Sequence, residues 1–241
     1  MIKILYIDAG CHKGEKIDYF SSVFFASKFP SPIDITIKGI EANPELYHPL
    51  VKKYKHCDNI DLYNFCIAQD FGSTDFYISD NTLGSSMYTG KFDQWTESFK
   101  ENIQSSVKVP TQPLSSFISS IDNLDQYDAK ILKANIEGGE YDMLLDLDRN
   151  NAFIFDFYIG SGDYPYSILD DFRKVTELKS KTNEAKLIMD KNNIVAHKLN
   201  GPAPNETWKN FNPNFNREPS NSKGNINIVQ AIIDLYIKKN D

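Results

Sequence analysis

The chain has 241 residues, of which 41% are hydrophobic and 13% aromatic, and its formal net charge is -7. A chain of this length buries one sizeable core, and α/β domains of this size usually stand alone, so we predict a single domain over residues 1–241. The sequence lacks the run of roughly 18 apolar residues that a transmembrane helix requires. Its excess of acidic residues argues against nucleic acid as a partner.

The N-terminal part of the chain alternates strands and helices. Residues 3–8 predict a buried strand. Ile17, Phe20 and Phe24 share one helical face, and prolines end that helix. Isoleucines then alternate along a second strand, which closes at Glu41.

A second helix and a third strand continue the same order. Asn43 followed by Pro44 is a typical helix start, with an N-cap residue before a proline at the first helical position. Residues 60–68 predict the third strand. The order strand, helix, strand, helix, strand implies a parallel sheet with right-handed crossovers.

The remainder of the chain is less regular. Further strands are predicted at 74–79, 130–136, 152–159, 193–199 and 225–236. Helices are predicted at 91–104, after Pro113, after Gly139 and over 168–175. Loops are predicted at 80–90 and 201–224, of which the second is long, rich in Pro and Asn, and a candidate lid or acceptor loop.

The three cysteines bear on the compartment. Cys11, Cys57 and Cys66 show no metal-binding spacing, so we interpret them as reduced thiols, with a Cys57–Cys66 disulfide as the alternative. Residues 2–10 do not resemble a signal peptide. We therefore expect a cytoplasmic protein with no membrane partner.

A glycine-containing turn joins the first strand to the first helix. It has the form D-x-G-x-x-x-G from Asp8 through Gly10 to Gly14, and glycine there lets the backbone approach a ligand closely. The fingerprint G-x-G-x-x-G is absent, which disfavours a pyrophosphate ligand. Glu41 ends the second strand, where doubly wound folds place an acid that accepts hydrogen bonds from a ribose diol. The structural alternatives are a turn without a ligand and an acid stabilised by the following helix dipole.

Six segments, in order, resemble the FkbM-type class I methyltransferases. They are YIDAGCHKG, GIEANPELY, CIAQDFGSTDFY, LGSSMY, VPTQPLSSFI and ILKANIEGGEYDML, within residues 3–145. The resemblance implies a single Rossmann-like, doubly wound α/β sheet, mostly parallel with a final antiparallel strand. It also implies S-adenosylmethionine as methyl donor and O-methylation, often of sugars or small natural products.

The resemblance further implies which residues contact the cofactor, at the ends of predicted strands and in the loops. The implied residues are Asp8 and Gly10 at the methionine end, Glu41 at the ribose with Ala42 and Asn43 beside it, Ala68, Gln69 and Asp70 near the adenine, and Ser85 and Ser86 toward the carboxylate end. His12 and Gly14 of the same glycine loop are further candidate cofactor contacts.

Methyl transfer to a hydroxyl is an in-line displacement that needs an aligned acceptor and a general base. Lys133, Asn135 and Glu137 alternate along the fourth predicted strand and so point to one face. We predict Glu137 as the base or acceptor-orienting acid and Asn135 as a hydrogen-bonding residue. Lys133 would act on Glu137 electrostatically or bind an acceptor oxygen. The alternative is a Lys133–Glu137 ion pair, with Glu140 capping the next helix.

Three differences from the family bear on the acceptor and on activity. Asn135 stands where the family usually has Asp, Cys11 and His12 replace Ala-Asn, and residues 155–165 (FDFYIGSGDYP) lack a Glu near a His.

Other candidate groups carry a weaker signal. His12 and His197 are interpreted as hydrogen-bonded structural residues. Asp163 is a second candidate base, or a metal partner of Glu137, although no metal is predicted.

Three functions fit these observations. The leading one is an O-methyltransferase acting on a saccharide or small hydroxylated metabolite. A nicotinamide-dependent oxidoreductase shares the fold and the ribose acid. A non-catalytic cofactor-binding module fits Asn135 and the altered fifth strand. The identity of the acceptor and the oligomeric state do not follow from the sequence.

Overall fold

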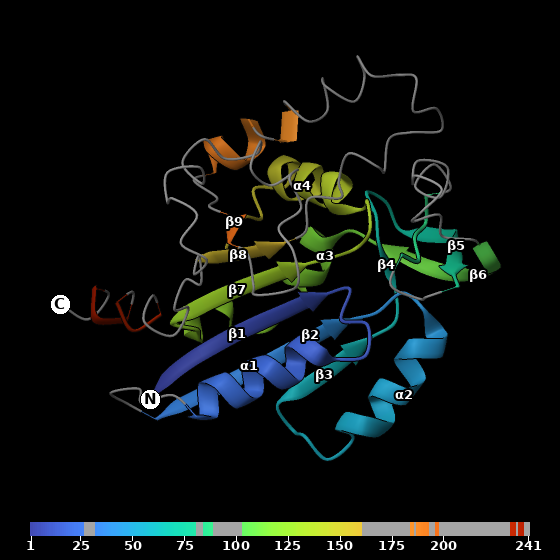
Figure 1. The fold of residues 1–241 in the computed structure, drawn as a ribbon. Coiled ribbons are helices and arrows are strands. Elements are labelled where there is room, and N and C mark those ends of the chain that lie inside the picture. The colour runs from blue at the N-terminus through green and yellow to red at the C-terminus, as the bar shows by residue number, and fades with distance from the viewer. Residues whose placement is uncertain are drawn as a thin grey trace, which may run out of the picture.

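Strands and helices alternate through most of the described chain (Figure 1). The computed structural model describes residues 1–26, 32–80, 84–88, 103–160, 184–185, 187–192, 196–197, 232–234 and 236–238. The main sheet and its helices comprise β1 (Ile2–Ala9), α1 (Glu15–Ala26), β2 (Ile33–Ile40), α2 (Pro44–Tyr54), β3 (Ile60–Tyr63), α3 (Leu114–Ser119), the 3-10 helix η3 (Leu124–Gln126), β7 (Ala129–Ala134), α4 (Glu140–Arg149), β8 (Phe157–Gly160) and β9 (Ala196–His197). A smaller sheet comprises β4 (Cys66–Ile67), β5 (Gly72–Ser79) and β6 (Ile103–Gln112).

The described strands of the main sheet follow the order β3-β2-β1-β7-β8-β9, and every described pair is parallel. From β1 the chain winds outward through β2 and β3, then returns to β7 on the other side of β1 and winds outward through β8 and β9. The winding therefore reverses between β1 and β7, and the loops that follow these two strands diverge. The predicted Rossmann-like, doubly wound α/β fold is confirmed.

Each face of the main sheet has its own hydrophobic core. On one face, Ile4 and Tyr6 of β1 cluster with Ile17 and Phe20 of α1 and with Leu50 of α2. The Tyr6 and Phe20 rings stack with their centroids 4.2 Å apart. The opposite face is covered by α3 and α4 (Figure 1). Because β1 is covered on both faces, it needs the continuous apolar run that the sequence supplies.

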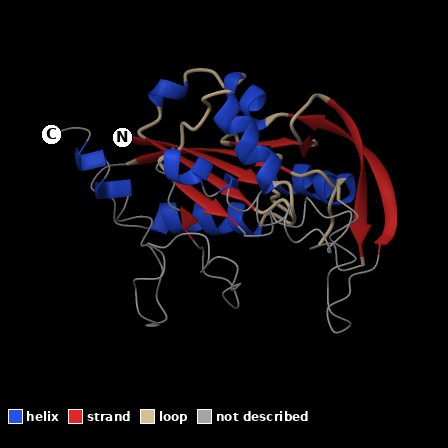
Figure 2. Cartoon of the chain, turned by 90° about the horizontal axis from the view of Figure 1, so that it is seen from above, coloured by secondary structure: helices blue, strands red, loops and turns tan. Residues whose placement is uncertain are grey.

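The smaller sheet stands at one end of the main sheet (Figures 1 and 2). In it β4 runs parallel to β6, and β5 runs antiparallel to β6. Its own small core contains Cys66, Phe76, Ile78 and Val109. In Figure 1 the arrows of β1, β2 and β7 point toward this sheet. It therefore forms a wall beyond the carboxyl ends of the main strands.

The chain passes from one sheet to the other at Asn64. Residues 60–68 were predicted as one strand, but β3 ends at Tyr63 and β4 begins at Cys66 in the smaller sheet. The Asn64 side-chain amide donates to the carbonyl oxygens of Glu41 and Ala42, at 2.7 and 3.0 Å. The apolar pattern continues through this break, so the pattern does not reveal the change of sheet.

The prediction of a helix over 91–104 is wrong at its end. Ile103 and Gln104 begin β6, while residues 89–102 lie outside the described part of the chain. Most of β6 is polar and exposed. A strand in a small, open sheet has little surface to bury, so it lacks the apolar alternation that marks a strand.

The predicted closing strand over 225–236 is also wrong where the structure describes it. Residues 232–234 and 236 are helical, and Ile232 is fully buried in the core that contains β1. An apolar run of this kind does not separate strand from helix by periodicity alone. Among the described pairs of the main sheet, the expected antiparallel strand is therefore not found.

The strands predicted at 130–136, 152–159 and 193–199 are present, the first two of them shorter than predicted. The strand predicted at 130–136 is β7, which stops at Ala134, and the strand predicted at 152–159 begins only at Phe157. The segment 193–199 contains β9.

Three further expectations concern the cysteines, membrane-spanning helices and the C-terminal part of the chain. Cys11, Cys57 and Cys66 are all free thiols, so the disulfide alternative is wrong. Within the described residues, every helix is too short or too polar to cross a bilayer. The predicted helix over 168–175 and the loop 201–224 lie outside the described residues.

A buried carboxylate joins the two helices on one face of the sheet. α3 follows Pro113, whose side chain cannot cap it. Asp146 of α4 instead accepts hydrogen bonds from the backbone N–H and the hydroxyl of Ser115, at 2.7 and 2.6 Å. The Asn150 side-chain amide donates to the same carboxylate at 2.9 Å. A negative acceptor at a helix N-terminus satisfies an unpaired N–H and the helix dipole together.

Asp146→Ala should lower the free energy of unfolding by about 2–4 kcal/mol, because the buried Ser115 donors lose their acceptor. Urea denaturation measures this loss. Asp148→Ala on the same helix is the control. Asp148 pairs at the surface with Lys191 at 2.8 Å, and its loss should cost about 1 kcal/mol or less. Equal losses for the two variants would contradict the assigned role of Asp146.

Candidate functional site

A pocket opens beyond the carboxyl ends of β1, β2 and β7, where the winding of the main sheet reverses. It holds about 630 Å³ of atom-free space, part of it open to solvent. Ligand sites in doubly wound folds occupy this position. The predicted site residues that line it are Gly10, His12, Glu41, Ala42, Ser85, Asn135 and Glu137.

Gly10 allows the loops after β1 and β7 to touch. Its φ is +75°, and a Cβ on this residue would lie 2.0 Å from the carbonyl oxygen of Asn135. Its N–H donates to the carbonyl of Ile40 at the end of β2, at 2.9 Å. Only glycine combines this left-handed backbone with such a close approach. The floor of the pocket is therefore bare backbone from two loops.

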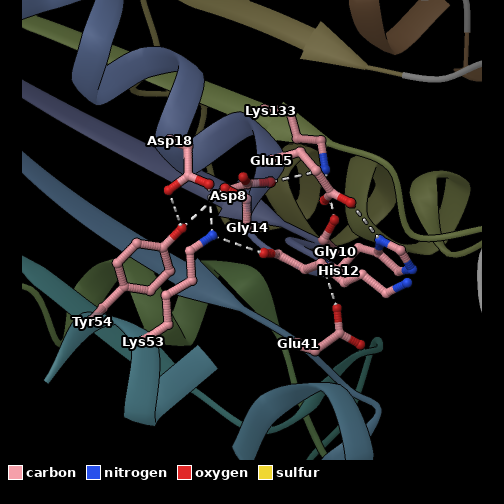
Figure 3. A network of polar contacts seen from close by, with 11 residues as sticks. Asp8, Gly10, His12, Gly14, Glu15, Asp18, Glu41, Lys53, Tyr54 and Lys133 are labelled. Atoms are coloured by element: carbon pink, nitrogen blue, oxygen red, sulfur yellow. Dashed lines mark hydrogen bonds and ion pairs between the residues drawn. The ribbon is translucent and has the colours of Figure 1, made fainter. Parts of the chain in front are cut away.

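Gly14, at the start of the first helix, has a packing role. Its φ is +80°, and a Cβ here would lie 2.4 Å from the Tyr54 hydroxyl oxygen. That hydroxyl lies 3.0 Å from the Gly14 carbonyl oxygen and 2.8 Å from Asp18 Oδ1. Lys53 pairs with the other oxygen of Asp18, at 2.6 Å (Figure 3). Gly14 thus fastens the loop to α2 and does not line the pocket.

Asp8 and Lys133 form a buried ion pair beneath the glycine loop. Asp8 is fully buried, and its Oδ1 lies 2.8 Å from Lys133 Nζ, a charge contact without hydrogen-bond alignment. Lys133 Nζ also donates to the Gly10 carbonyl oxygen at 2.6 Å (Figure 3). The alternative of a Lys133–Glu137 ion pair is therefore wrong. Asp8 and Lys133 support the loop from below and do not line the pocket.

Glu41 bridges the loop after β1 and the start of α2. Its two carboxylate oxygens accept from the N–H of His12 at 2.7 Å and from the N–H of Asn43 at 2.9 Å. Burial raises the pKa of Glu41 to about 7, although the two N–H groups and Lys133 act in the opposite direction. Each carboxylate oxygen retains a second lone pair, so the group can accept further hydrogen bonds from a ligand.

His12 sits in the same loop with a φ of +50°. Its Nδ1 lies 3.2 Å from Glu15 Oε1 at the start of α1 (Figure 3). His12 is one of the residues that line the pocket. This contact agrees with the interpretation of His12 as a hydrogen-bonded residue. The side chain of His197 lies outside what the structure describes.

Asn43 acts as a helix cap. Its Oδ1 accepts from the N–H of Glu45 at 2.9 Å, and its side chain is buried away from the pocket lining. Asn43 therefore contacts Glu41, the predicted ribose acid, only through its backbone N–H, and its side chain is used to cap α2.

The residues predicted near the adenine face away from the pocket. Gln69 donates to Asp142 Oδ1 at 2.7 Å and accepts from Arg149 at 2.7 Å, both on α4. Ala68 and Asp70 are engaged with β6 through their backbones. Ala68, Gln69 and Asp70 therefore do not line the pocket, because β4 turns its buried residues toward it instead.

The loop 84–88 supplies one predicted residue to the lining and one to its support. Ser85 lines the pocket, and its hydroxyl accepts from the N–H of Ser79 at 3.1 Å. Ser86 is fully buried and pairs through its backbone with Tyr77 of β5. Its hydroxyl donates to the Glu137 carbonyl oxygen at 2.8 Å.

Asn135 and Glu137 both line the pocket, but not as predicted. The alternation of Lys133, Asn135 and Glu137 assumed a strand to residue 136, whereas β7 ends at Ala134. Glu137 lies in a turn with a φ of +54°, followed by Gly138 at +108°. The turn, and not strand alternation, brings Glu137 into the pocket while Lys133 points to Asp8.

The pocket also has an apolar wall, which the sequence does not predict. Its residues are Leu46 of α2, Phe65 between β3 and β4, Cys66, Ile67 and Phe76 of the smaller sheet, and Met87 of loop 84–88. Burial raises the pKa of the Cys66 thiol to about 12, with smaller contributions from Glu41 and Asp142. Each of these residues carries the ordinary signal of a core position, so no pattern in the sequence separates the wall from the core.

Within the described residues, no group of three or more His, Cys, Asp or Glu side chains is arranged to hold a metal ion. Asp163, the suggested metal partner of Glu137, lies outside those residues.

Comparison with known proteins identifies a family. A model described as the methyltransferase FkbM domain matches residues 8–178, well over half of the chain. The chain is also similar to the crystal structure of methyltransferase FkbM from Methylobacillus flagellatus KT, with 14% identity and a TM-score of 0.36. That alignment covers 60% of this chain and 29% of the other, so this chain spans under a third of the solved protein. No curated protein sequence matches the chain.

Gly10→Ala should lower the free energy of unfolding by about 2–4 kcal/mol, since it adds left-handed strain to a clash with the Asn135 backbone. Chemical denaturation of the cofactor-free protein measures the loss. Gly72→Ala is the control, because a Cβ at Gly72 meets only Thr111 Oγ1 at an ordinary 3.6 Å. Its effect should stay within about 1 kcal/mol. If Gly10→Ala unfolds at the same denaturant concentration as the wild type, the close contact between Gly10 and Asn135 is not required for stability.

Proposed function

The chain belongs to the FkbM methyltransferase domain family, and from this membership we propose that it transfers the methyl group of S-adenosylmethionine to a hydroxyl of a saccharide or another small metabolite. The observation that carries the proposal is Glu41, a buried carboxylate that lines the pocket beside the bare backbone of Gly10.

The donor set of the pocket fits an adenosyl cofactor. Glu41 keeps one lone pair on each oxygen for the two hydroxyls of a ribose, after its bonds to His12 and Asn43. The glycine loop leaves room for a chain that passes close to the backbone. The apolar wall around Phe76 and Met87 suits a flat heterocycle. The pocket is less suited to a pyrophosphate, because the glycine fingerprint G-x-G-x-x-G of dinucleotide sites is absent.

Bound S-adenosylmethionine supplies an already activated methyl group. The chain has to orient the acceptor and remove its proton. Glu137 lines the pocket, and we expect its carboxylate to take the proton of an acceptor hydroxyl. Asn135 lies two residues away in the same lining and offers an amide to hold an acceptor or cofactor oxygen.

Several parts of the proposal concern the rest of the chain. Residues 1–241 would act as one methyltransferase domain, the loop 201–224 would contact the acceptor, and the protein would work in the cytoplasm. A nicotinamide-dependent oxidoreductase shares the ribose acid but receives no support from the family match. A non-catalytic cofactor-binding module differs from the proposal only in its lack of methyl turnover.

Glu41→Gln should weaken S-adenosylmethionine binding by about 5- to 150-fold at pH 8, because a charged acceptor of two hydroxyls is lost. The pKa of Glu41, about 7 in the free protein, adds a pH dependence. Ribose hydroxyls favour the ionised form, so wild-type affinity should fall as the pH drops through 7, and the Gln variant should lack this fall.

Calorimetric titration with S-adenosylmethionine and with NAD at several pH values tests this prediction. Asp61→Asn is the control, since Asp61 lies on β3, is half exposed and pairs with Lys38 of β2. Binding of NAD alone would reject the proposed cofactor. Equal pH slopes in wild type and Glu41→Gln would reject the role of Glu41.

Glu137→Gln should leave cofactor affinity within about twofold and reduce methyl transfer by roughly 100-fold or more, as expected for the loss of a general base. The measurement is radiolabel transfer from methyl-labelled S-adenosylmethionine to a panel of saccharides and small hydroxylated metabolites. Full activity in Glu137→Gln would show that another group is the base. Cofactor binding without transfer to any acceptor would favour the non-catalytic module.

A further inference from the structure

The turn that carries Glu137 is held by side chains from two separate elements. Glu137 is a non-glycine residue with a φ of +54°. Side chains with a Cβ rarely adopt this backbone, and it persists only where the surroundings fix it. Glu137 lines the pocket, so its backbone turn sets the point from which its carboxylate extends. The groups that fix the turn therefore bear directly on where that carboxylate lies.

Glu140, the first residue of α4, holds the turn from one side. Its Oε1 accepts from the N–H of Ile136 and its Oε2 from the N–H of Gly138, both at 2.8 Å. These are the amides immediately before and after Glu137. Glu140 is fully buried. Burial, and then the charge of Glu137, raise the pKa of Glu140, while the two amides lower it.

Ser86 holds the turn from the other side. Its hydroxyl donates to the Glu137 carbonyl oxygen at 2.8 Å and accepts from the N–H of Tyr88 at 3.1 Å. Because the Ser86 hydroxyl oxygen accepts from the N–H of Tyr88, its proton is free to point at the Glu137 carbonyl oxygen. Two backbone bonds to Tyr77 of β5, at 2.8 and 3.0 Å, fix Ser86 itself.

The same helix also anchors the loop that carries Ser86. The Tyr88 hydroxyl donates to the Asp142 carboxylate, and Asp142 lies two residues after Glu140 on α4. The first turn of α4 thus holds both the turn with Glu137 and the loop with Ser86.

We propose that Glu140 and Ser86 are positioning residues that lock the left-handed turn at Glu137 and so fix its carboxylate in the pocket. This proposal rests on the proposed function, in which Glu137 takes the acceptor proton. It goes beyond a cap on α4, because Glu140 binds the amides on both sides of Glu137. Neither Glu140 nor Ser86 is itself a lining residue of the pocket.

The test uses Glu140→Gln and Ser86→Ala in the full chain. A glutamine has one oxygen, so it can accept from only one of the two amides, and its NH₂ group meets the other N–H. In the cofactor-free protein, amide hydrogen exchange at Ile136 and Gly138 should speed up at least about tenfold in Glu140→Gln. Asp148→Asn, farther along α4 at the surface, is the matched control and should leave these rates unchanged.

Kinetics separate positioning from simple stability. Both variants should lower kcat by about tenfold or more, with KM for S-adenosylmethionine within about twofold of wild type. Glu140→Gln should also move the acid limb of the pH–rate profile to lower pH, because a negative neighbour of Glu137 is lost. Ser86→Ala removes no charge, so its acid limb should stay in place. If Glu140→Gln does not fold, Ser86→Ala decides the proposal through kcat.

The outcomes are distinguishable from failure of the proposed function. A wild-type protein that transfers no methyl group, or a fully active Glu137→Gln variant, rejects the proposed function, and the exchange rates still report whether Glu140 holds the turn. With the proposed function intact, unchanged exchange at both amides, or an unchanged kcat and acid limb in Glu140→Gln, overturns the positioning role.

Discussion

The site depends on the contact between Gly10 and the carbonyl of Asn135. β1 and β7 lie side by side at the point where the sheet reverses its winding, and their following loops have to separate to leave a pocket. At Gly10 they still touch, with no side chain between them. Beyond that point one loop leads to α1 and the other to α4, and the open space lies between them. The left-handed φ of Gly10 directs the first loop away from the second.

Charge around this contact is arranged in layers. Asp8 and Lys133 neutralise each other beneath the glycine loop, and Lys133 also binds the Gly10 carbonyl. Glu41 and Glu140 are buried one layer higher, and each uses its two oxygens to hold a pair of backbone amides. Burying a charge is costly unless it is paired or hydrogen-bonded. These carboxylates thus serve two purposes, because the bonds that stabilise them also shape the loops.

The sequence predicts the first half of this arrangement better than the second. β1, β2, Gly10 and Glu41 follow from apolar runs, a glycine turn and an acid at a strand end, all of which are local signals. The break at Asn64 and the strand β6 do not follow, because a polar strand in a small sheet and a change of sheet inside an apolar run leave no periodic signal.

The second half of the site, around Glu137, is not predicted correctly from the sequence for a related reason. Strand alternation placed Lys133 with Glu137, but one early strand end and one left-handed residue separate them. The positive φ at Glu137 is accompanied by local bonds from Glu140 and by a bond from Ser86, which lies 51 residues away in the sequence. The long-range bond from Ser86 leaves no signal in a single sequence. The apolar wall was missed because Phe76 and Met87 look like any buried residues.

The smaller sheet has its own hydrophobic core, so part of the pocket wall packs separately from the main sheet. Phe76 lies in a cluster with Cys66, Ile78 and Val109, apart from the two clusters that pack against the main sheet. Phe65 and Ile67 of the same wall instead pack with Leu5 and Ile7 of β1 in the core of the main sheet. A change of size at Phe76 would therefore alter the shape of the pocket while the packing around β1 stays as it is, whereas a change at Phe65 or Ile67 would disturb both.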